Sequence, residues 1–263
     1  MINKKKGRKD SGVKNVVEMN NAAALNKKGI DANATGNYSF AVDAFSKSIE
    51  LNPDDIYTYY CRGGAYSKLG NYHKAIEDYN KFIELNPDDV YSYYCRGVAY
   101  SKLGNYNKAI EDYSKAIDLY PQLALLYNKR GIIYEKISEQ RRAIEDYSEA
   151  IRLKPNNADF YYNRALAYSI LDQYQLSIED LTKIIHLKPD YAVAYSNRGV
   201  LYFLQSKDNL GYNDAQKACA LGNCELLEWA RSKKGNAVEV VGSLKLIIGG
   251  NPHFDTLSKA EDK

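Results

Sequence analysis

The sequence predicts an all-α protein that is built from about six consecutive helical hairpins. Three observations lead to this prediction. A pattern of 34 residues recurs between Ala22 and Gly222, and the copy at 90–123 differs from the copy at 56–89 at only ten positions. Each copy contains two stretches with apolar residues at helical spacing. A proline closes each of the first five copies. Short units of this kind bury their core only against neighbouring units, as in a solenoid.

The first predicted helix of each copy has a small residue near its middle, which allows a second helix to approach closely. In the copy at 56–89 this helix covers 59–69, with Gly63 and Tyr66 on one side. Gly70 follows it, and glycine readily adopts the left-handed conformation that often ends a helix. The small residues of the six copies are Gly29, Gly63, Gly97, Gly131, Ala165 and Gly199.

The second predicted helix carries the larger apolar side chains. In the copy at 56–89 it covers 72–85, with Ala75, Tyr79 and Phe82 at helical spacing. Pro87 ends this helix, because proline cannot continue the hydrogen-bond ladder. Asp89 then stands where an acidic residue can cap the next helix. Each copy is therefore expected to form one helix–turn–helix hairpin.

A 34-residue period with a small residue, an aromatic residue and a closing proline at fixed offsets resembles the tetratricopeptide repeat. The resemblance implies a right-handed superhelical α-solenoid in which the first helix of each repeat lines the concave inner surface. We place the repeats at 22–55, 56–89, 90–123, 124–157, 158–191 and 192–222.

The two ends lie outside the repeats. Residues 1–21 carry six basic and two acidic side chains, which predicts a basic flexible N-terminal arm. Residues 223–234 contain Trp229 and resemble the capping helix that ends many tetratricopeptide arrays. Residues 235–263 form a tail that could be a strand, a docked extended segment or a disordered segment.

A basic residue precedes the small residue in every copy, and in five copies an aspartate follows that basic residue by sixteen positions. We expect each arginine to pair with the aspartate of its own hairpin, rather than to form a ladder for phosphate or nucleic acid. The first copy has Lys28 and Ala44 at these positions, so no pair is expected there. The predicted pairs are Arg62 with Asp78, Arg96 with Asp112, Arg130 with Asp146, Arg164 with Asp180, and Arg198 with Asp214.

The sequence shows no catalytic motif, so we expect neither enzymatic activity nor a small-molecule substrate. The three histidines are scattered, and the four cysteines form no CxxC pair, so no metal or cofactor is expected. Cys61 and Cys95 occupy equivalent positions and are interpreted as reduced packing residues. No segment is apolar over the length that a membrane span requires. The sequence therefore predicts a cytoplasmic protein.

The resemblance implies that a partner would contact the first helices. Tyrosine offers a large contact area at low entropic cost, so Tyr57, Tyr60, Tyr91, Tyr94 and Tyr162 are the leading candidates. Replacing Tyr60 and Tyr94 by alanine is expected to weaken partner binding without unfolding the array. Only fragments of the family's carboxylate-binding clamp are present, which disfavours that mode. The polar candidates on the same helices are Lys68, Lys102, Asn128, Lys129, Asn163 and Asn197.

These features favour a non-catalytic scaffold or adaptor that binds a peptide or partner helix of another protein. One alternative is an RNA-binding helical-repeat protein, which the near-neutral array and the matched arginines disfavour. Another is a structural subunit of a larger enzyme complex. The sequence leaves the partner and the oligomeric state open.

Overall fold

The computed structural model describes residues 6–232, with side chains from Val17 onward, and this part of the chain contains thirteen helices and no strand. It divides into two compact units with the boundary between Ile137 and Ser138. None of the helices in this described part is both long enough and apolar enough to cross a membrane.

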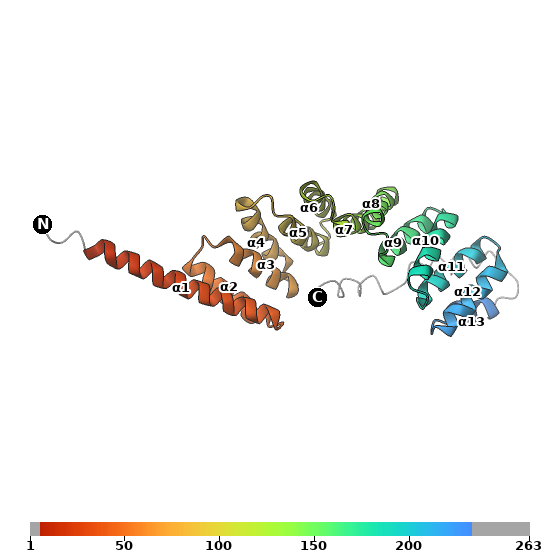
Figure 1. Ribbon diagram of the computed structural model, residues 1–263, viewed down its shortest axis with the longest axis horizontal. Coiled ribbons are helices and arrows are strands. Elements are labelled where there is room, and N and C mark those ends of the chain that lie inside the picture. The colour runs from red at the N-terminus through yellow and green to blue at the C-terminus, as the bar shows by residue number, and fades with distance from the viewer. Residues whose placement is uncertain (1–5, 233–263) are drawn as a thin grey trace. The chain divides into compact units, whose positions relative to one another are not determined.

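The first unit contains seven helices, and each packs against the next along the chain (Figure 1). The third helix, α3, also contacts α1 and α5. The seven are α1 (Lys6–Ala34), α2 (Tyr38–Leu51), α3 (Ile56–Lys68), α4 (Tyr72–Leu85), α5 (Val90–Lys102), α6 (Tyr106–Leu119) and α7 (Ala124–Lys136).

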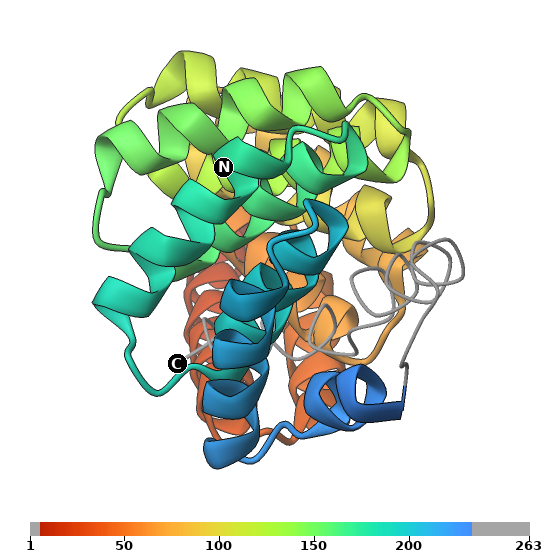
Figure 2. The ribbon, with the colours of Figure 1, turned by 90° about the vertical axis from the view of Figure 1, so that its right-hand side faces the viewer.

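The second unit contains the remaining six helices, drawn in green to blue in Figure 2. The short last helix, α13, packs against α12 and α11. The fourth repeat contributes α7 to the first unit and its second helix, α8, to the second unit. The six helices are α8 (Gln140–Leu153), α9 (Ala158–Ile170), α10 (Tyr174–Leu187), α11 (Ala192–Leu204), α12 (Asp208–Ala220) and α13 (Glu225–Ser232).

The structure changes the expected boundaries at the N-terminus. Helix α1 begins at Lys6 and runs without a break to Ala34, so it includes residues 6–21, where the sequence led us to expect a flexible arm. Lysine and arginine are good helix formers and no proline interrupts this stretch, so the first repeat helix extends beyond Ala22. The tail at 235–263 lies outside the described residues.

Small residues and tyrosines make the hairpins close-packed, as the sequence pattern predicts. A Cβ atom added at Gly97 would lie 2.9 Å from the ring of Tyr113, closer than real Cβ contacts allow. At Gly63 the corresponding distance to the ring of Tyr79 is 3.0 Å. Both tyrosine side chains are 2% exposed. Glycine is therefore needed at these positions so that a ring of the second helix can lie against the backbone of the first.

The turn inside each hairpin needs a left-handed residue. Gly70 and Gly104 have φ values of +76° and +75°. Ser138 and Ser206 occupy the equivalent positions of later repeats and keep the same conformation, with φ values of 64° and 57°. The geometry of the turn is thus retained where glycine is lost, at the cost of backbone strain in the serines.

Replacing Ser138 or Ser206 by glycine is expected to stabilise the protein by about 0.5 kcal/mol each. Glycine removes about 1–2 kcal/mol of left-handed backbone strain from the folded state. It also increases the conformational entropy of the unfolded chain, which offsets part of that gain in stability. Urea unfolding followed by circular dichroism measures the change. The reverse substitution, Gly104→Ser, should destabilise by a similar amount. A loss of stability in both glycine variants would contradict the strain.

The last helix closes the array with an apolar face. Leu226, Leu227 and Ala230 of α13 are at most 5% exposed, and Leu226 and Leu227 pack in a cluster that also contains Val200 and Ala215. The ring of Trp229 lies 5.5 Å from that of Phe203. These contacts agree with the capping role that the sequence predicts for this helix.

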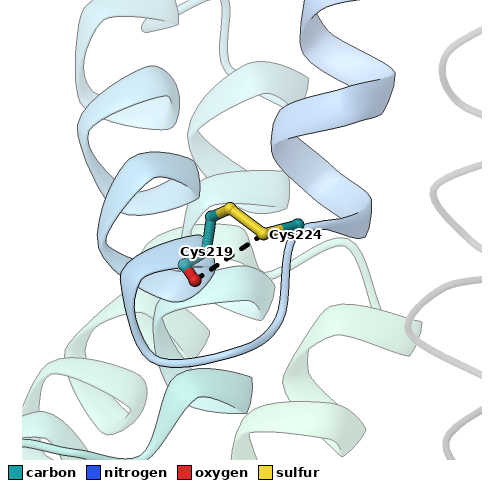
Figure 3. The surroundings of a disulfide bond; sticks show 2 residues. All are labelled: Cys219 and Cys224. Carbon is teal, nitrogen blue, oxygen red and sulfur yellow. Dashed lines mark hydrogen bonds between the residues drawn. A yellow bond between two sulfur atoms is a disulfide. The ribbon is translucent and has the colours of Figure 1, made fainter.

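A disulfide joins Cys219, near the end of α12, to Cys224, the residue before α13 (Figure 3). The sequence pattern did not predict this bond. The Cys224 sulfur also lies 3.6 Å from the carbonyl oxygen of Cys219. Disulfides persist in oxidising compartments and are reduced in the cytosol. The structure therefore shows Cys219 and Cys224 oxidised, whereas the cytoplasmic location predicted from the sequence would keep both thiols reduced.

Candidate functional site

The arginines that precede the small residues are tied to the aspartates sixteen positions later. In the third repeat, Arg96 donates from Nε and Nη2 to the two carboxylate oxygens of Asp112, at 2.9 and 2.7 Å. The same two-bond geometry joins three further predicted pairs: Arg62 with Asp78, Arg164 with Asp180, and Arg198 with Asp214. The pair of Arg96 with Asp112 and these three further pairs are confirmed. The pair of Arg130 with Asp146 stays a prediction, because Arg130 belongs to the first unit and Asp146 to the second.

Each arginine also reaches the preceding hairpin, which the sequence analysis did not predict. The Nη1 atom of Arg96 donates to Asn80 Oδ1 at 2.7 Å, and Asn80 lies on the second helix of the previous repeat. Each guanidinium is therefore bonded to a neighbouring repeat. The equivalent donations run from Arg62 to Ser46, from Arg130 to Ser114, from Arg164 to Ser148, and from Arg198 to Thr182.

Two tyrosines lie close to each of these guanidinium groups. The guanidinium carbon of Arg96 is 5.5 Å from the ring centre of Tyr93 and 6.0 Å from that of Tyr100, within the range of a cation–π contact. The side chains of Arg62, Arg96, Arg164 and Arg198 are at most 19% exposed. Burial raises the pKa of Asp112, and the hydrogen bonds from Arg96 oppose that rise. These arginines therefore hold the repeats together and offer little charge to an external anion.

The first helices of the second and third repeats, α3 and α5, contact each other. The Tyr60 hydroxyl of α3 lies 3.9 Å from the sulfur of Cys95 on α5, so the two helices touch through these side chains. The Tyr60 ring packs on Phe82 with centres 5.2 Å apart, and the Tyr94 ring lies 6.2 Å from Tyr113. Burial raises the pKa of Tyr60 well above its ordinary value. Tyr60 and Tyr94 therefore pack against the second helices of their hairpins and are only partly exposed.

Tyr57 and Tyr91 are the accessible tyrosines among the predicted contacts. They occupy equivalent positions in the first turns of α3 and α5, and each is 62% exposed. The Tyr57 ring meets the edge of Phe82 at 5.5 Å, so one side of the ring is supported by the hairpin. A supported but exposed aromatic ring is well suited to contact a partner.

Four other predicted contact residues are buried, and we remove them from the candidate set. Asn128, Tyr162, Asn163 and Asn197 are between 4% and 7% exposed, so they offer a partner almost no surface. In the second unit, Asn197 Nδ2 donates to the Tyr162 hydroxyl at 3.3 Å. The sequence could not separate these residues from Tyr57, because both kinds lie on the first helices of their repeats and only tertiary packing decides their exposure.

Two of the three predicted lysines lie at the other ends of α3 and α5. Lys68 and Lys102 are exposed in the last turns of α3 and α5, whereas Lys129 is half-buried in the middle of α7. No group of three or more histidine, cysteine, aspartate or glutamate side chains in the described residues could hold a metal ion. Exposed tyrosines at one end and lysines at the other are thus the accessible features of this face.

Models of the tetratricopeptide repeat match the sequence at 44–77, 90–123 and 158–191, and a TPR repeat model matches at 63–104 and 139–169. Together the matched ranges span 44–123 and 139–191, about half of the chain. The matches at 90–123 and 158–191 each cover one helical hairpin, α5 with α6 and α9 with α10. The α-solenoid architecture that the sequence predicted is confirmed.

Solved structures share this architecture. Two crystal structures of MamA are 27% and 26% identical, cover 61% and 65% of this chain and 94% of their own chains, and give TM-scores of 0.59 and 0.61. YrrB, described as a TPR protein with an unusual peptide-binding site, is 21% identical, with 73% of this chain and 100% of its own covered and a TM-score of 0.62. At that identity YrrB supports the fold alone. A comparison with curated proteins finds no match.

Proposed function

Because the chain belongs to the tetratricopeptide-repeat family, we propose that it is a non-catalytic scaffold or adaptor that binds a peptide or helix of a partner protein. The proposed contact surface is the inner face of the first unit, formed by α3 and α5. The observation that carries this proposal is the exposure of Tyr57 and Tyr91, 62% each, at equivalent positions of two helices in contact.

Tyr57 and Tyr91 leave most of their surface accessible, so both rings are available for contact with a partner. Tyrosine and tryptophan are enriched among the residues that dominate binding energy at protein interfaces. Here two copies of the same side chain repeat along neighbouring helices, so one extended segment or helix could contact both. The peptide-binding site named for YrrB is a property of that protein, and it supports peptide binding as a use of this fold.

RNA binding is the weaker alternative. A helical-repeat RNA-binding surface needs accessible cations and stacking groups along its inner face. The repeated arginines of this chain are bonded internally and at most 19% exposed where their pairs are described. The most regular source of positive charge is therefore not available to a phosphate backbone.

The test is affinity capture with the whole chain, followed by quantitative mass spectrometry, beside the double variant Tyr57→Ala/Tyr91→Ala. We expect at least a tenfold loss of the specifically retained partners, since each interface tyrosine typically contributes about 1–2 kcal/mol. The matched control is Tyr120→Ala, because Tyr120 is 52% exposed but follows α6 and lies outside the first helices.

Circular dichroism should show that both variants remain folded. If the double variant retains the same partners at wild-type level, Tyr57 and Tyr91 do not contribute to partner binding. Tyr60→Ala/Tyr94→Ala is less informative than the sequence suggested, because Tyr60 and Tyr94 also pack on the second helices.

A further inference from the structure

The short helix α13 cannot be stable without its neighbours. It has eight residues, and isolated helices of fewer than about 12 residues are marginal in water. One face of the helix is apolar and docked, since Leu226, Leu227 and Ala230 are at most 5% exposed. The opposite face carries the exposed Glu225 and Glu228. The helical state of α13 therefore depends on its docking against the second unit.

The surface beneath α13 is apolar. Leu226 packs in one cluster with Val200 of α11 and Ala215 of α12, and both of these residues are fully buried. A Cβ atom added at Gly199 would lie 2.8 Å from Leu226 Cδ2, so α13 lies directly against the backbone of α11. The occupant of this apolar surface is α13 itself, and the surface is uncovered whenever α13 leaves it.

Two specific bonds hold α13 on α12, one near each end of the short helix. Near its end, the Tyr212 hydroxyl of α12 donates to the carbonyl oxygen of Ala230 at 2.6 Å. At its beginning, the disulfide joins Cys224 to Cys219 of α12 (Figure 3). The carbonyl oxygen of Cys224 accepts the hydrogen bond of the Glu228 N–H at 2.9 Å. The disulfide therefore anchors the first turn of α13 to the last turn of α12.

The disulfide can be reached by small thiols, and the turn that it spans has its own backbone hydrogen bonds. Cys219 and Cys224 are both partly exposed. The N–H of Gly222 donates to the carbonyl oxygen of Cys219, and that of Asn223 donates to the carbonyl oxygen of Ala218, both at 2.9 Å. These bonds do not involve sulfur, so they keep the two cysteines close together after reduction. The disulfide can therefore form again within the same turn by thiol–disulfide exchange.

We propose that the Cys219–Cys224 disulfide is a redox switch that controls the docking of α13. In the oxidised protein, the first turn of α13 is held on α12. A dithiol reductant breaks the S–S bond: each sulfur gains one electron and one proton, and the dithiol is oxidised to its own disulfide. After reduction α13 opens more often and exposes the apolar surface around Val200 and Ala215. This switch lies in the second unit and is independent of the proposed contact surface on α3 and α5.

The size of the effect follows from the chain that the disulfide closes. A disulfide restricts the conformations of the open state, and for a loop of about six residues this restriction favours the closed state by about 10–40-fold. The apolar contacts of α13 with α11 and α12 are the same in both redox states. We therefore expect reduction to increase the opening of α13 by that factor and to leave the rest of the second unit folded.

The test is hydrogen–deuterium exchange of the whole chain, oxidised with glutathione disulfide or reduced with dithiothreitol. We expect the amides of α13 to exchange at least tenfold faster after reduction, because they exchange through local opening. The amides of α10, which packs on α9 and α11, should keep their rates. Trp229 is the only tryptophan, and its ring lies against Phe203. Its fluorescence should shift to longer wavelength as α13 opens.

The matched control is the variant Cys219→Ala/Cys224→Ala, which cannot form the bond. Its α13 amides should exchange at the fast rate of the reduced protein under both conditions. The variant keeps Cys61 and Cys95, which are not disulfide-bonded, so it also shows whether dithiothreitol acts through those residues. Circular dichroism should show that the variant is folded. The comparison of the oxidised and reduced wild-type chain needs no substitution, so it decides the matter even where the variant does not fold.

Three results would overturn the proposal. The first is equal exchange of α13 in the oxidised and reduced wild-type chain. The second is faster exchange on reduction throughout α9–α13, which would mean that the disulfide stabilises the whole unit rather than the docking of α13. The third is alkylation of all four cysteines by iodoacetamide in the unfolded chain after glutathione disulfide treatment, since the disulfide would then not have formed.

Discussion

Replacing Asp112 by alanine is expected to destabilise the third hairpin by about 3 kcal/mol, because the substitution leaves a largely buried guanidinium without its carboxylate. Arg96 and Asp112 are 18% and 6% exposed in their side chains, so water can restore only part of the lost interaction. Arg96 would keep its bond to Asn80 and its contacts with two tyrosine rings. These remaining contacts hold the charge in place but cannot neutralise it.

Hydrogen–deuterium exchange of the amides in α5 and α6 is the suitable measurement, because repeat arrays need not unfold in a single step. The matched control is Glu111→Ala, the exposed neighbour of Asp112, for which a change within about 0.5 kcal/mol is expected. Equal exchange rates in the two variants would show that the ion pair does not stabilise the hairpin.

A second comparison separates the pair from the packing around it. The double variant Arg96→Met/Asp112→Leu replaces both charges with apolar side chains, and such replacements of buried pairs are often neutral or stabilising. We expect it to recover most of the stability that Asp112→Ala loses. Failure to recover would indicate that the bond from Arg96 to the preceding repeat is the more important one.

Replacing Tyr113 by alanine is expected to cost about 3–5 kcal/mol, the range for loss of a large buried aromatic side chain. Tyr113 is 2% exposed, and its ring lies where a Cβ at Gly97 would be only 2.9 Å away. Removal of the ring leaves a cavity between the two helices of the third hairpin. The glycine backbone cannot fill that cavity, because Gly97 has no side chain.

The control for Tyr113→Ala is Tyr91→Ala, which removes the same side chain from a position that is 62% exposed in the same repeat. Thermal unfolding followed at 222 nm should show a large loss for Tyr113→Ala and little change for Tyr91→Ala. A similar melting temperature for the two variants would contradict the assignment of Tyr113 to the core. The same comparison supports Tyr91 as a surface residue that can be changed without unfolding.

Most of the fold could be predicted from the 34-residue period of the sequence. Pro87 stops a helix because it lacks a backbone N–H, and Gly70 permits a positive φ. Both effects are local, so they can be predicted from the sequence. The constant offset of sixteen between Arg96 and Asp112 was equally legible, because both ends of that pair lie in one hairpin. Because the same pattern recurs in several repeats, each of these local predictions is supported more than once.

Other features were not predictable because they depend on contacts between elements. The bond from Arg96 to Asn80 crosses from one repeat to the next, and the exposure of Tyr57 against the burial of Tyr162 depends on neighbouring helices. The disulfide of Cys219 with Cys224 requires the turn between α12 and α13 to bring the two residues together. None of these facts follows from helical periodicity.

The sequence by itself determined that this chain consists of helical hairpins of the tetratricopeptide type, because backbone conformation and binary patterning are set by residues close together in the chain. The tertiary structure alone decided which side chains of the first helices are available to a partner. Tyr91 of α5 is exposed to solvent and Asn163 of α9 is buried, since the exposure of a side chain depends on the neighbours that pack around it.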